Sequence, residues 1–220
     1  MDISIFRVIG PVMIGPSSSH TAGAARLARA AALIAKGPFT HISFGLHGSF
    51  AKTYKGHGTD KALVAGALGL RENDEMLSSS FQLAEQRGIT FDFYEAKLDG
   101  MHENSVKITM TMQGGGDQTI IGSSIGGGQI LIRDINGFDA EISLQSPTII
   151  IDQYDKKGII SEVSKILADN GLNIASMRLS RKARGDKACC IIETDDPIPE
   201  KIERQLLHNY NIIQVSVIND

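Results

Sequence analysis

The last third of the chain alternates between strand-like and helix-like patterns in an order that few folds accommodate. Four strand patterns and two helical patterns follow one another there, at 148–153, 158–170, 173–180, 187–194, 199–209 and 212–218. In the first helical pattern apolar residues recur every three or four positions, and Gly171 follows as a stop. Strand, helix, two strands, helix and strand in so short a segment predict the ferredoxin-like split β-α-β arrangement.

The residues before this segment form a less regular second region. Short alternating stretches begin it at 3–14, and the later elements are expected at 20–36, 40–47, 61–70, 72–87, 89–96, 105–112, 118–124 and 129–135. Pro147 separates the two regions. We therefore predict an α+β protein. Its first domain, 1–146, has a mixed sheet with helices on one face, and its second, 147–220, is ferredoxin-like.

The stretch Gly15-Pro16-Ser17-Ser18-Ser19-His20-Thr21-Ala22-Gly23 places four hydroxyls and an imidazole just before an alanine-rich helix. A helix N-terminus offers backbone N–H donors and a positive dipole end, which together bind anions. A simple N-cap is the alternative, because Ser and Thr begin many helices. A cap needs one hydroxyl, however, so this composition favours a site for a carboxylate.

A second histidine lies between glycines in Lys55-Gly56-His57-Gly58-Thr59-Asp60. This stretch precedes and opens a helix expected at 61–70, with Thr59 or Asp60 as its N-cap. Glycines allow a ligand to approach the imidazole closely. A flexible loop with a surface histidine is the alternative. The remaining histidines, at 41, 47, 102 and 208, lack such surroundings and are interpreted as ordinary residues.

Composition excludes several classes of protein. The chain has 22 basic and 25 acidic residues, so it lacks the positive charge that nucleic-acid binding needs. No apolar run reaches membrane-spanning length and no signal-peptide pattern is present, so we expect a cytoplasmic protein and no membrane partner. Cys189 and Cys190 are adjacent, and neighbours in a strand point to opposite faces. We therefore expect neither a disulfide nor a metal site on this chain.

The second half resembles an ACT domain, a small regulatory module of enzymes of amino-acid metabolism. The residues that carry the likeness are Asp152-Gln153-Tyr154-Asp155-Lys156-Lys157-Gly158-Ile159-Ile160 and Gly171-Leu172-Asn173-Ile174-Ala175. In that family the turn before the first helix approaches an amino-acid effector or a partner domain. The resemblance implies effector contacts from Lys157, Gly158, Ile159 and Asn173.

The first half resembles the β subunit, or β region, of iron–sulfur-dependent L-serine dehydratase. Gly15-Pro16-Ser17-Ser18-Ser19-His20-Thr21 and Gly56-His57-Gly58-Thr59-Asp60-Lys61-Ala62 match that family in sequence and in order. The resemblance implies a lyase of amino-acid metabolism and gluconeogenesis that converts L-serine to pyruvate and ammonia without pyridoxal phosphate. A [4Fe–4S] cluster acts as its Lewis acid. The cysteine-bearing α region is absent here, which implies a heteromer in which a separate α subunit holds the cluster.

The resemblance also implies roles for individual residues. His20 and His57 would transfer protons or hold the leaving hydroxyl, and neither the motifs nor the resemblance says which is the base. Thr59 and Asp60 would orient His57 or cap the following helix. Substrate binding is expected from Ser17, Ser18, Ser19, Thr21, Gly58, Thr59 and Asp60. Homodimerisation through the ACT or N-terminal domain is a habit of the family.

Two other functions stay open at this point. One is a non-catalytic protein that senses an amino acid, because serine-pathway dehydrogenases carry similar domains for regulation. The two histidine motifs favour catalysis over sensing. The other is a hydrolase that uses Ser18 and His20 as nucleophile and base. No acidic residue is paired with this histidine, and neighbours in sequence rarely reach that geometry.

Overall fold

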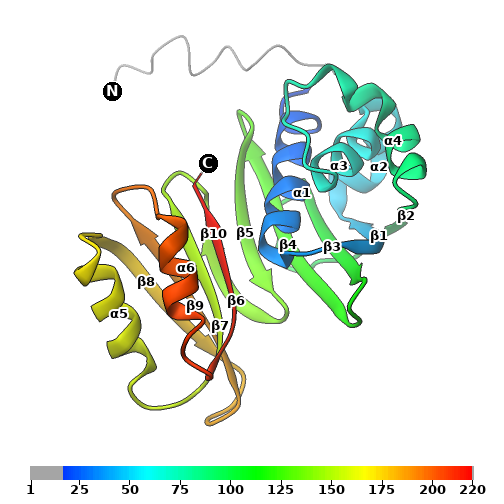
Figure 1. Cartoon of the computed structure of the whole chain (residues 1–220). Coiled ribbons are helices and arrows are strands. Elements are labelled where there is room, and N and C mark those ends of the chain that lie inside the picture. The colour runs from blue at the N-terminus through cyan, green and yellow to red at the C-terminus, as the bar shows by residue number, and fades with distance from the viewer. Residues whose placement is uncertain (1–16, 220) are drawn as a thin grey trace. The chain divides into compact units, whose positions relative to one another are not determined.

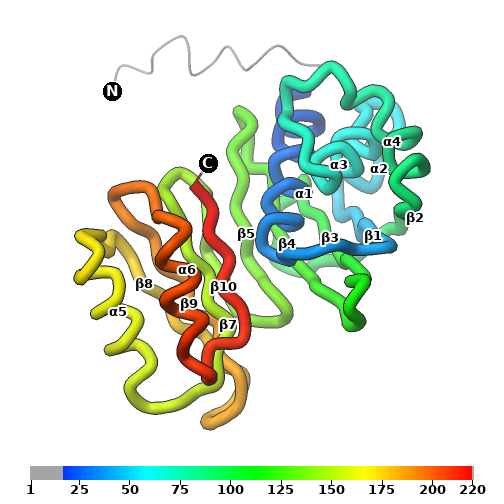
Figure 2. The backbone as a smooth tube through the Cα atoms, in the orientation of Figure 1, coloured from blue at the N-terminus to red at the C-terminus, as the bar shows by residue number. Residues whose placement is uncertain are grey.

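A computed structural model describes residues 17–219 of the chain, so the lead-in expected at 3–14, Gly15 and Pro16 lie outside the described residues. The chain divides into two compact units, 1–136 and 137–220. Figure 1 shows their helices and strands, and Figure 2 shows the backbone path of each. Within the described part, no helix is both long and apolar enough to cross a membrane.

The first unit is organised on a mixed sheet. Within this unit the strands follow the order β2-β1-β3-β4-β5. β2 pairs with β1 in parallel, whereas β1 with β3, β3 with β4 and β4 with β5 are antiparallel. The bounds are β1 Phe39–Leu46, β2 Thr90–Glu95, β3 Ser105–Met112, β4 Asp117–Gly126 and β5 Gln129–Ile135. The predicted mixed sheet is confirmed.

Helices cover one face of this sheet (Figure 1). Ile42, Phe44 and Leu46 of β1 are buried beneath them. The helices are α1 Ala22–Ala35, α2 Gly48–His57, α3 Thr59–Ala67, the 3-10 helix η2 Glu75–Ser79 and α4 Ser80–Gln86.

Small residues let α1 approach its neighbours closely. A Cβ on Gly66 of α3 would lie 2.0 Å from the carbonyl oxygen of Ala25 in α1. A Cβ on Gly23 of α1 would lie 1.9 Å from Ser124 Oγ on β4. The alanine-rich sequence of α1 therefore serves packing between helices and onto the sheet.

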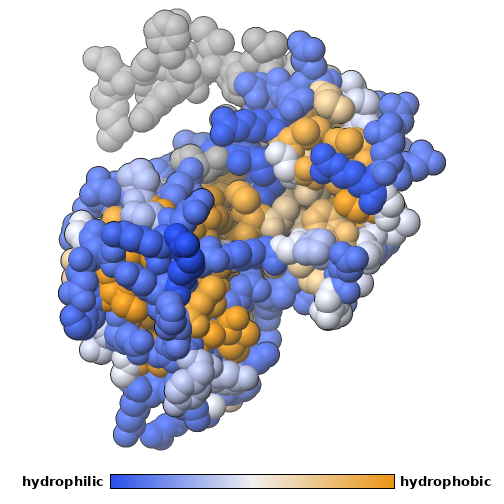
Figure 3. Space-filling view, in the orientation of Figure 1, coloured by the Kyte–Doolittle hydropathy of each residue, from blue (hydrophilic) through white to orange (hydrophobic). Residues whose placement is uncertain are grey.

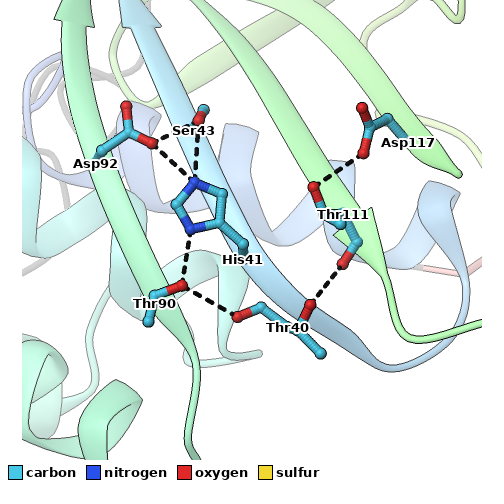
Figure 4. A network of polar contacts seen from close by, with 7 residues as sticks. All are labelled: Thr40, His41, Ser43, Thr90, Asp92, Thr111 and Asp117. Atoms are coloured by element: carbon cyan, nitrogen blue, oxygen red, sulfur yellow. Dashed lines mark hydrogen bonds and ion pairs between the residues drawn. The ribbon is translucent and has the colours of Figure 1, made fainter. Parts of the chain in front are cut away.

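The alternate residues of β1 and β2 form a polar network on the other side of the sheet (Figure 4). His41 Nδ1 lies 2.7 Å from Thr90 Oγ1, and its Nε2 lies 2.8 Å from Asp92 Oδ2. Ser43 donates to the same carboxylate. The ring thus lies between the Thr90 hydroxyl and the Asp92 carboxylate, and its Nε2 is also 3.2 Å from Ser43 Oγ. The network ties β1 to β2 and gives His41 polar surroundings that its sequence context does not indicate.

The second unit has the predicted ferredoxin-like order. It contains β6 Phe138–Ile142, β7 Thr148–Tyr154, α5 Ile159–Asp169, β8 Ile174–Arg181, β9 Lys187–Thr194, α6 Glu200–Leu206 and β10 Ile212–Ile218. The four-stranded sheet follows the order β10-β7-β9-β8, and neighbouring strands in it are antiparallel. Its core joins Ile149 and Ile151 of β7 to Val163 and Leu167 of α5.

The second unit begins at Gly137, before the boundary expected at Pro147. Arg178 on β8 explains the difference, because its guanidinium donates to Asp139 at 2.8 Å and to Glu141 at 2.6 Å. Ser180 also donates to the carbonyl of Asp139. These contacts tie β6 to the strand that follows α5, so residues 137–146 pack with the second unit.

Cys189 and Cys190 are both fully buried and free. Cys190 belongs to the core on the helix side of the sheet, whereas Cys189 faces the other side beside Asp152. Burial raises the pKa of both thiols, and that of Cys190 reaches about 12. The two thiols are thus packing residues.

Candidate active site

The serine-rich motif folds as a helical turn that runs into α1. Thr21 N donates to Ser17 O at 3.1 Å, and Gly23 N donates to Ser18 O at 3.0 Å. Thr21 occupies the N-cap position of α1, yet its side chain makes no capping hydrogen bond. The hydroxyls of this motif are therefore not explained by helix capping.

His20 lies at the centre of the site and is only 7% exposed. Its Nδ1 lies 3.1 Å from Ser17 Oγ, and its Nε2 lies 3.2 Å from Ser49 Oγ. The ring of Phe50 meets it edge-on, with a centroid distance of 5.2 Å. Hydroxyls can donate or accept, so this pair suits a neutral imidazole with one N–H and one lone pair.

The second motif lies against the first. The rings of His57 and His20 have centroids 4.7 Å apart. The structure thus brings together the two histidines that the sequence analysis selected from separate motifs.

The helix start expected at Lys61, with Thr59 or Asp60 as its N-cap, is wrong. Residues 48–57 form helix α2, which ends at His57, and Gly58 follows in the left-handed conformation with a φ of 69°. Gly58, rather than Thr59 or Asp60, is the residue before α3, and no side chain caps that helix. The sequence of α2 contains two glycines and only Phe50 is buried, so the helix depends on that anchor rather than on an apolar stripe.

Three buried polar atoms of the two motifs have no hydrogen-bond partner among the described residues. They are Thr21 Oγ1, His57 Nδ1 and Thr59 Oγ1. An unsatisfied buried polar group costs roughly 1–3 kcal/mol, so native structures contain few of them. Their concentration beside His20 indicates a site that is completed by a polar ligand.

One of these residues, Thr21, lines a cavity of about 190 Å³, together with Gly58, which lies between the other two in the chain. It is lined by Thr21, Lys55, Gly58, Asp60, Lys61, Ala62, Leu77 and Ser78. Asp60 Oδ1 accepts from the backbone N of Lys61, and burial raises the pKa of the Asp60 carboxyl. Two ammonium groups and one carboxylate give the cavity a net positive wall, which suits a small carboxylic acid.

Burial lowers the pKa of His20, and the neighbouring His57 lowers it further, while the contact with Ser49 partly opposes both. The native state therefore disfavours the imidazolium form. The unfolded chain binds a proton on this ring near pH ~6.5. Since the unfolded state then carries more protons, stability falls as pH drops below that value.

His20→Gln should therefore reduce the loss of unfolding free energy between about pH 7 and pH 5. Urea unfolding of wild type and variant at both pH values measures the difference. His208→Gln, which removes an exposed histidine of the second unit, serves as the control and should leave the wild-type pH dependence intact. An equal loss in His20→Gln and wild type would contradict the assignment.

The residues predicted for effector binding are partly brought together. Lys157, Gly158 and Ile159 line a cavity of about 430 Å³ with Glu162 and residues 208–211. Asn173 instead donates to Asp195 at 2.5 Å. Effector binding by the first three residues stays a prediction.

Ser49 and Phe50 were missed by the sequence analysis. Both residues contact the imidazole of His20, Ser49 through a hydrogen bond and Phe50 through its ring. The only indication in the sequence is their position just after the strand at 40–47, because residues after a strand often line a site.

Comparisons with known proteins agree with the division into two parts. The family model of the serine dehydratase beta chain matches residues 4–78, and that of the ACT domain matches residues 148–207. A protein of Peptoniphilus asaccharolyticus named L-serine dehydratase, beta chain is 42% identical over 94% of this chain and 93% of its own length. A Bacillus subtilis protein named probable L-serine dehydratase, beta chain is 43% identical over 99% of this chain and 98% of its own.

A more distant similarity covers much of the chain. D-3-phosphoglycerate dehydrogenase of Bacillus subtilis is 28% identical over 84% of this chain, which corresponds to 35% of that protein.

Proposed function

The chain belongs to the family of L-serine dehydratase β chains, and from this premise we propose that it completes the active site of a two-subunit L-serine ammonia-lyase. The reaction removes the α-proton and the hydroxyl of L-serine as water and gives aminoacrylate. Aminoacrylate tautomerises to an imine, which water hydrolyses to pyruvate and ammonia. The observation that carries the proposal is the pair of histidine rings 4.7 Å apart at the hydroxyl-rich first turn of α1.

In this proposal the motif hydroxyls bind and orient the substrate carboxylate. Thr21 and Thr59 offer buried hydroxyls that have no partner within residues 17–219. Lys55 and Lys61 add positive charge to the cavity. Fixing the carboxylate holds the reacting carbon against the imidazoles, and such orientation is a large part of catalysis.

His57 is the better placed of the two histidines for proton transfer. Both nitrogens of His20 already contact hydroxyls, of Ser17 and Ser49. His57 Nδ1 is buried without a partner in the described part of the chain. We therefore propose that His57 exchanges the proton with substrate and that His20, kept neutral by burial, holds the adjacent ring in place.

The donors of this chain do not fit a cysteine-ligated cluster. Its two cysteines are adjacent and buried, and among the described residues no group of three or more His, Cys, Asp or Glu side chains could hold a metal ion. We propose that the α subunit holds the [4Fe–4S] cluster, which would act as Lewis acid on the substrate hydroxyl.

Self-association is proposed through the second unit. Strand β8 is the outer strand of its described sheet, and Met177 and Leu179 on it are 36% and 44% exposed. Figure 3 shows patches of hydrophobic surface among the hydrophilic side chains of this unit. An open strand edge with apolar side chains favours pairing with a second copy.

The test of the proposed function is anaerobic pyruvate formation from L-serine. The purified chain, a cluster-loaded α subunit and their mixture are assayed in parallel. Pyruvate is expected from the mixture alone. Turnover by this chain without its partner, or full turnover by the α subunit without this chain, would overturn the proposal.

Single alanine substitutions of Ser17, Ser18 and Ser19 should each weaken catalysis moderately. The loss of one of several donors to a carboxylate costs about 1–3 kcal/mol, or roughly 5- to 150-fold in kcat/KM. A serine that acted as nucleophile would instead be indispensable. Steady-state kinetics of the three variants in the mixture measure the difference, and complete loss in Ser18→Ala alone would favour a hydrolase.

The similarity to D-3-phosphoglycerate dehydrogenase favours a second candidate, a surface that senses an amino acid without chemistry. A sensing surface needs donors for a carboxylate but no proton-transfer group. Substitution of His57 discriminates between the two functions.

A further inference from the structure

Two further buried polar atoms of the first unit belong to neither motif. Asn104 Oδ1 and Ser124 Oγ have no hydrogen-bond partner within the described part of the chain. Ser124 is 0% exposed. Since each such atom costs roughly 1–3 kcal/mol of stability, both require an explanation.

The two residues are neighbours at the same end of β3 and β4, which are interior strands of the sheet. Ser124 lies near the end of β4 and Asn104 directly before β3. The backbone N of Ser124 donates to the carbonyl of Asn104 at 2.9 Å. Ser124 Oγ points at the first turn of α1, because a Cβ on Gly23 would lie 1.9 Å from it.

The same end of the sheet also supports the residues that hold His20. Glu103, next to Asn104, accepts through its carbonyl from Ser49 N at 2.8 Å and from Phe50 N at 3.4 Å. The side chains of Ser49 and Phe50 contact the His20 ring. Asn104 therefore adjoins the residue that holds Ser49 and Phe50, and Ser124 lies against the start of α1.

The chemistry of these atoms selects the ligand group that would satisfy them. An amide oxygen only accepts hydrogen bonds, and a serine hydroxyl can accept. An amino-acid substrate has one group that only donates, its α-ammonium. The substrate carboxylate is already assigned to hydroxyls and lysines, so the ammonium needs hydrogen-bond acceptors elsewhere in the site.

We propose that Asn104 Oδ1 and Ser124 Oγ accept hydrogen bonds from the α-ammonium of the substrate. This pair would make the site specific for amino acids over hydroxy acids of the same size. The inference rests on the proposed function and adds to it two substrate-binding residues and a basis for specificity.

The test compares two ligands in the assembled enzyme. L-Serine carries the ammonium, whereas 3-hydroxypropionate has the same carboxylate and hydroxyl without it. Asn104→Leu should raise KM for L-serine about 10- to 100-fold, as expected for a lost hydrogen bond to a charged group. The inhibition constant of 3-hydroxypropionate should change less than about twofold, because this analogue makes no such bond. Ser124→Ala should show the same selectivity with a smaller effect.

Two variants act as controls. Asn104→Asp keeps an acceptor in the same place, so KM for L-serine should stay within about threefold of wild type. Ser123→Ala removes the hydroxyl that lies 2.7 Å from Ser105 Oγ. It should lower thermal stability and leave the ratio between the two ligands unchanged. Melting temperatures of all variants separate folding from binding.

Equal weakening of both ligands by Asn104→Leu would overturn the proposal, as would an unchanged KM for L-serine. If the proposed function itself is wrong, the mixture of the wild-type chain with the α subunit forms no pyruvate from L-serine. The two ligands are then compared by calorimetry on the purified chain. A preference for L-serine that Asn104→Leu abolishes supports the inference there, and a wild-type chain without that preference overturns it.

Discussion

His57→Ala in the assembled enzyme is expected to lower kcat for L-serine by about 10²- to 10⁴-fold, the usual contribution of a general acid or base. The imidazole ends α2 beside His20, and its Nδ1 is buried without a partner among residues 17–219. Removing it leaves the carboxylate contacts in place, so KM should change much less than kcat. Initial rates of pyruvate formation over a range of L-serine concentrations give both constants.

His41→Ala provides the matched control. His41 lies in the polar network of β1 and β2, where it contacts Thr90 and Asp92 (Figure 4). This substitution should leave kcat unchanged within the error of the assay. Full activity of His57→Ala would instead assign the histidine pair to sensing, and the second candidate function would replace the first.

Gly66→Ala is expected to lower the free energy of unfolding of the first unit by about 3 kcal/mol, the upper part of the range for overpacking a core. The added Cβ would lie 2.0 Å from the carbonyl oxygen of Ala25 and within 3.0 Å of its Cα. Both are backbone atoms, so α1 and α3 must separate. Because α1 begins at the serine-rich turn, activity should fall together with stability. Urea unfolding measures the change.

Gly56→Ala is the matched control for this substitution. Gly56 lies within α2, and a Cβ there would meet no atom within 4 Å. Alanine favours a helix over glycine by about 0.5–1 kcal/mol, so this variant should be slightly more stable than wild type. A destabilisation of Gly66→Ala no larger than about 0.5 kcal/mol would contradict the packing argument.

The second unit could be predicted almost completely because its local patterns and its tertiary packing agree. The strand expected at 212–218 is β10, and the helix expected at 158–170 contains α5. The apolar stripe of α5 and the alternation of the strands each identify the face that is buried. Where every local preference agrees with the fold, sequence patterns suffice.

α2 could not be predicted because its sequence contains little that favours a helix. Its ten residues include two glycines and a single buried side chain, Phe50. Contacts distant in sequence fix its start, where Ser49 N and Phe50 N donate to Glu103 O. Such contacts depend on the sheet being formed and leave no periodic pattern in the sequence.

The sequence predicts the two histidine motifs of the candidate site, but it does not indicate the residues that surround them. His20 and His57 were selected because unusual runs of serine and glycine surround them, and the structure places their rings together. Ser49, Asn104 and Ser124 lie outside both histidine motifs, and no unusual run of residues marks them. Only the pairing of β3 with β4 and the position of α1 bring them to the same end of the sheet.

The burial of both cysteines has a practical consequence for work on the assembled enzyme. Alkylation requires a thiol that is both accessible and ionised. Burial removes the access of solvent to Cys189 and Cys190 and raises the pKa of both thiols. Under native conditions this chain should therefore remain unlabelled by iodoacetamide. Any alkylation of the intact complex would then report on thiols of the partner subunit, and the appearance of label on this chain would report the unfolding of its second unit.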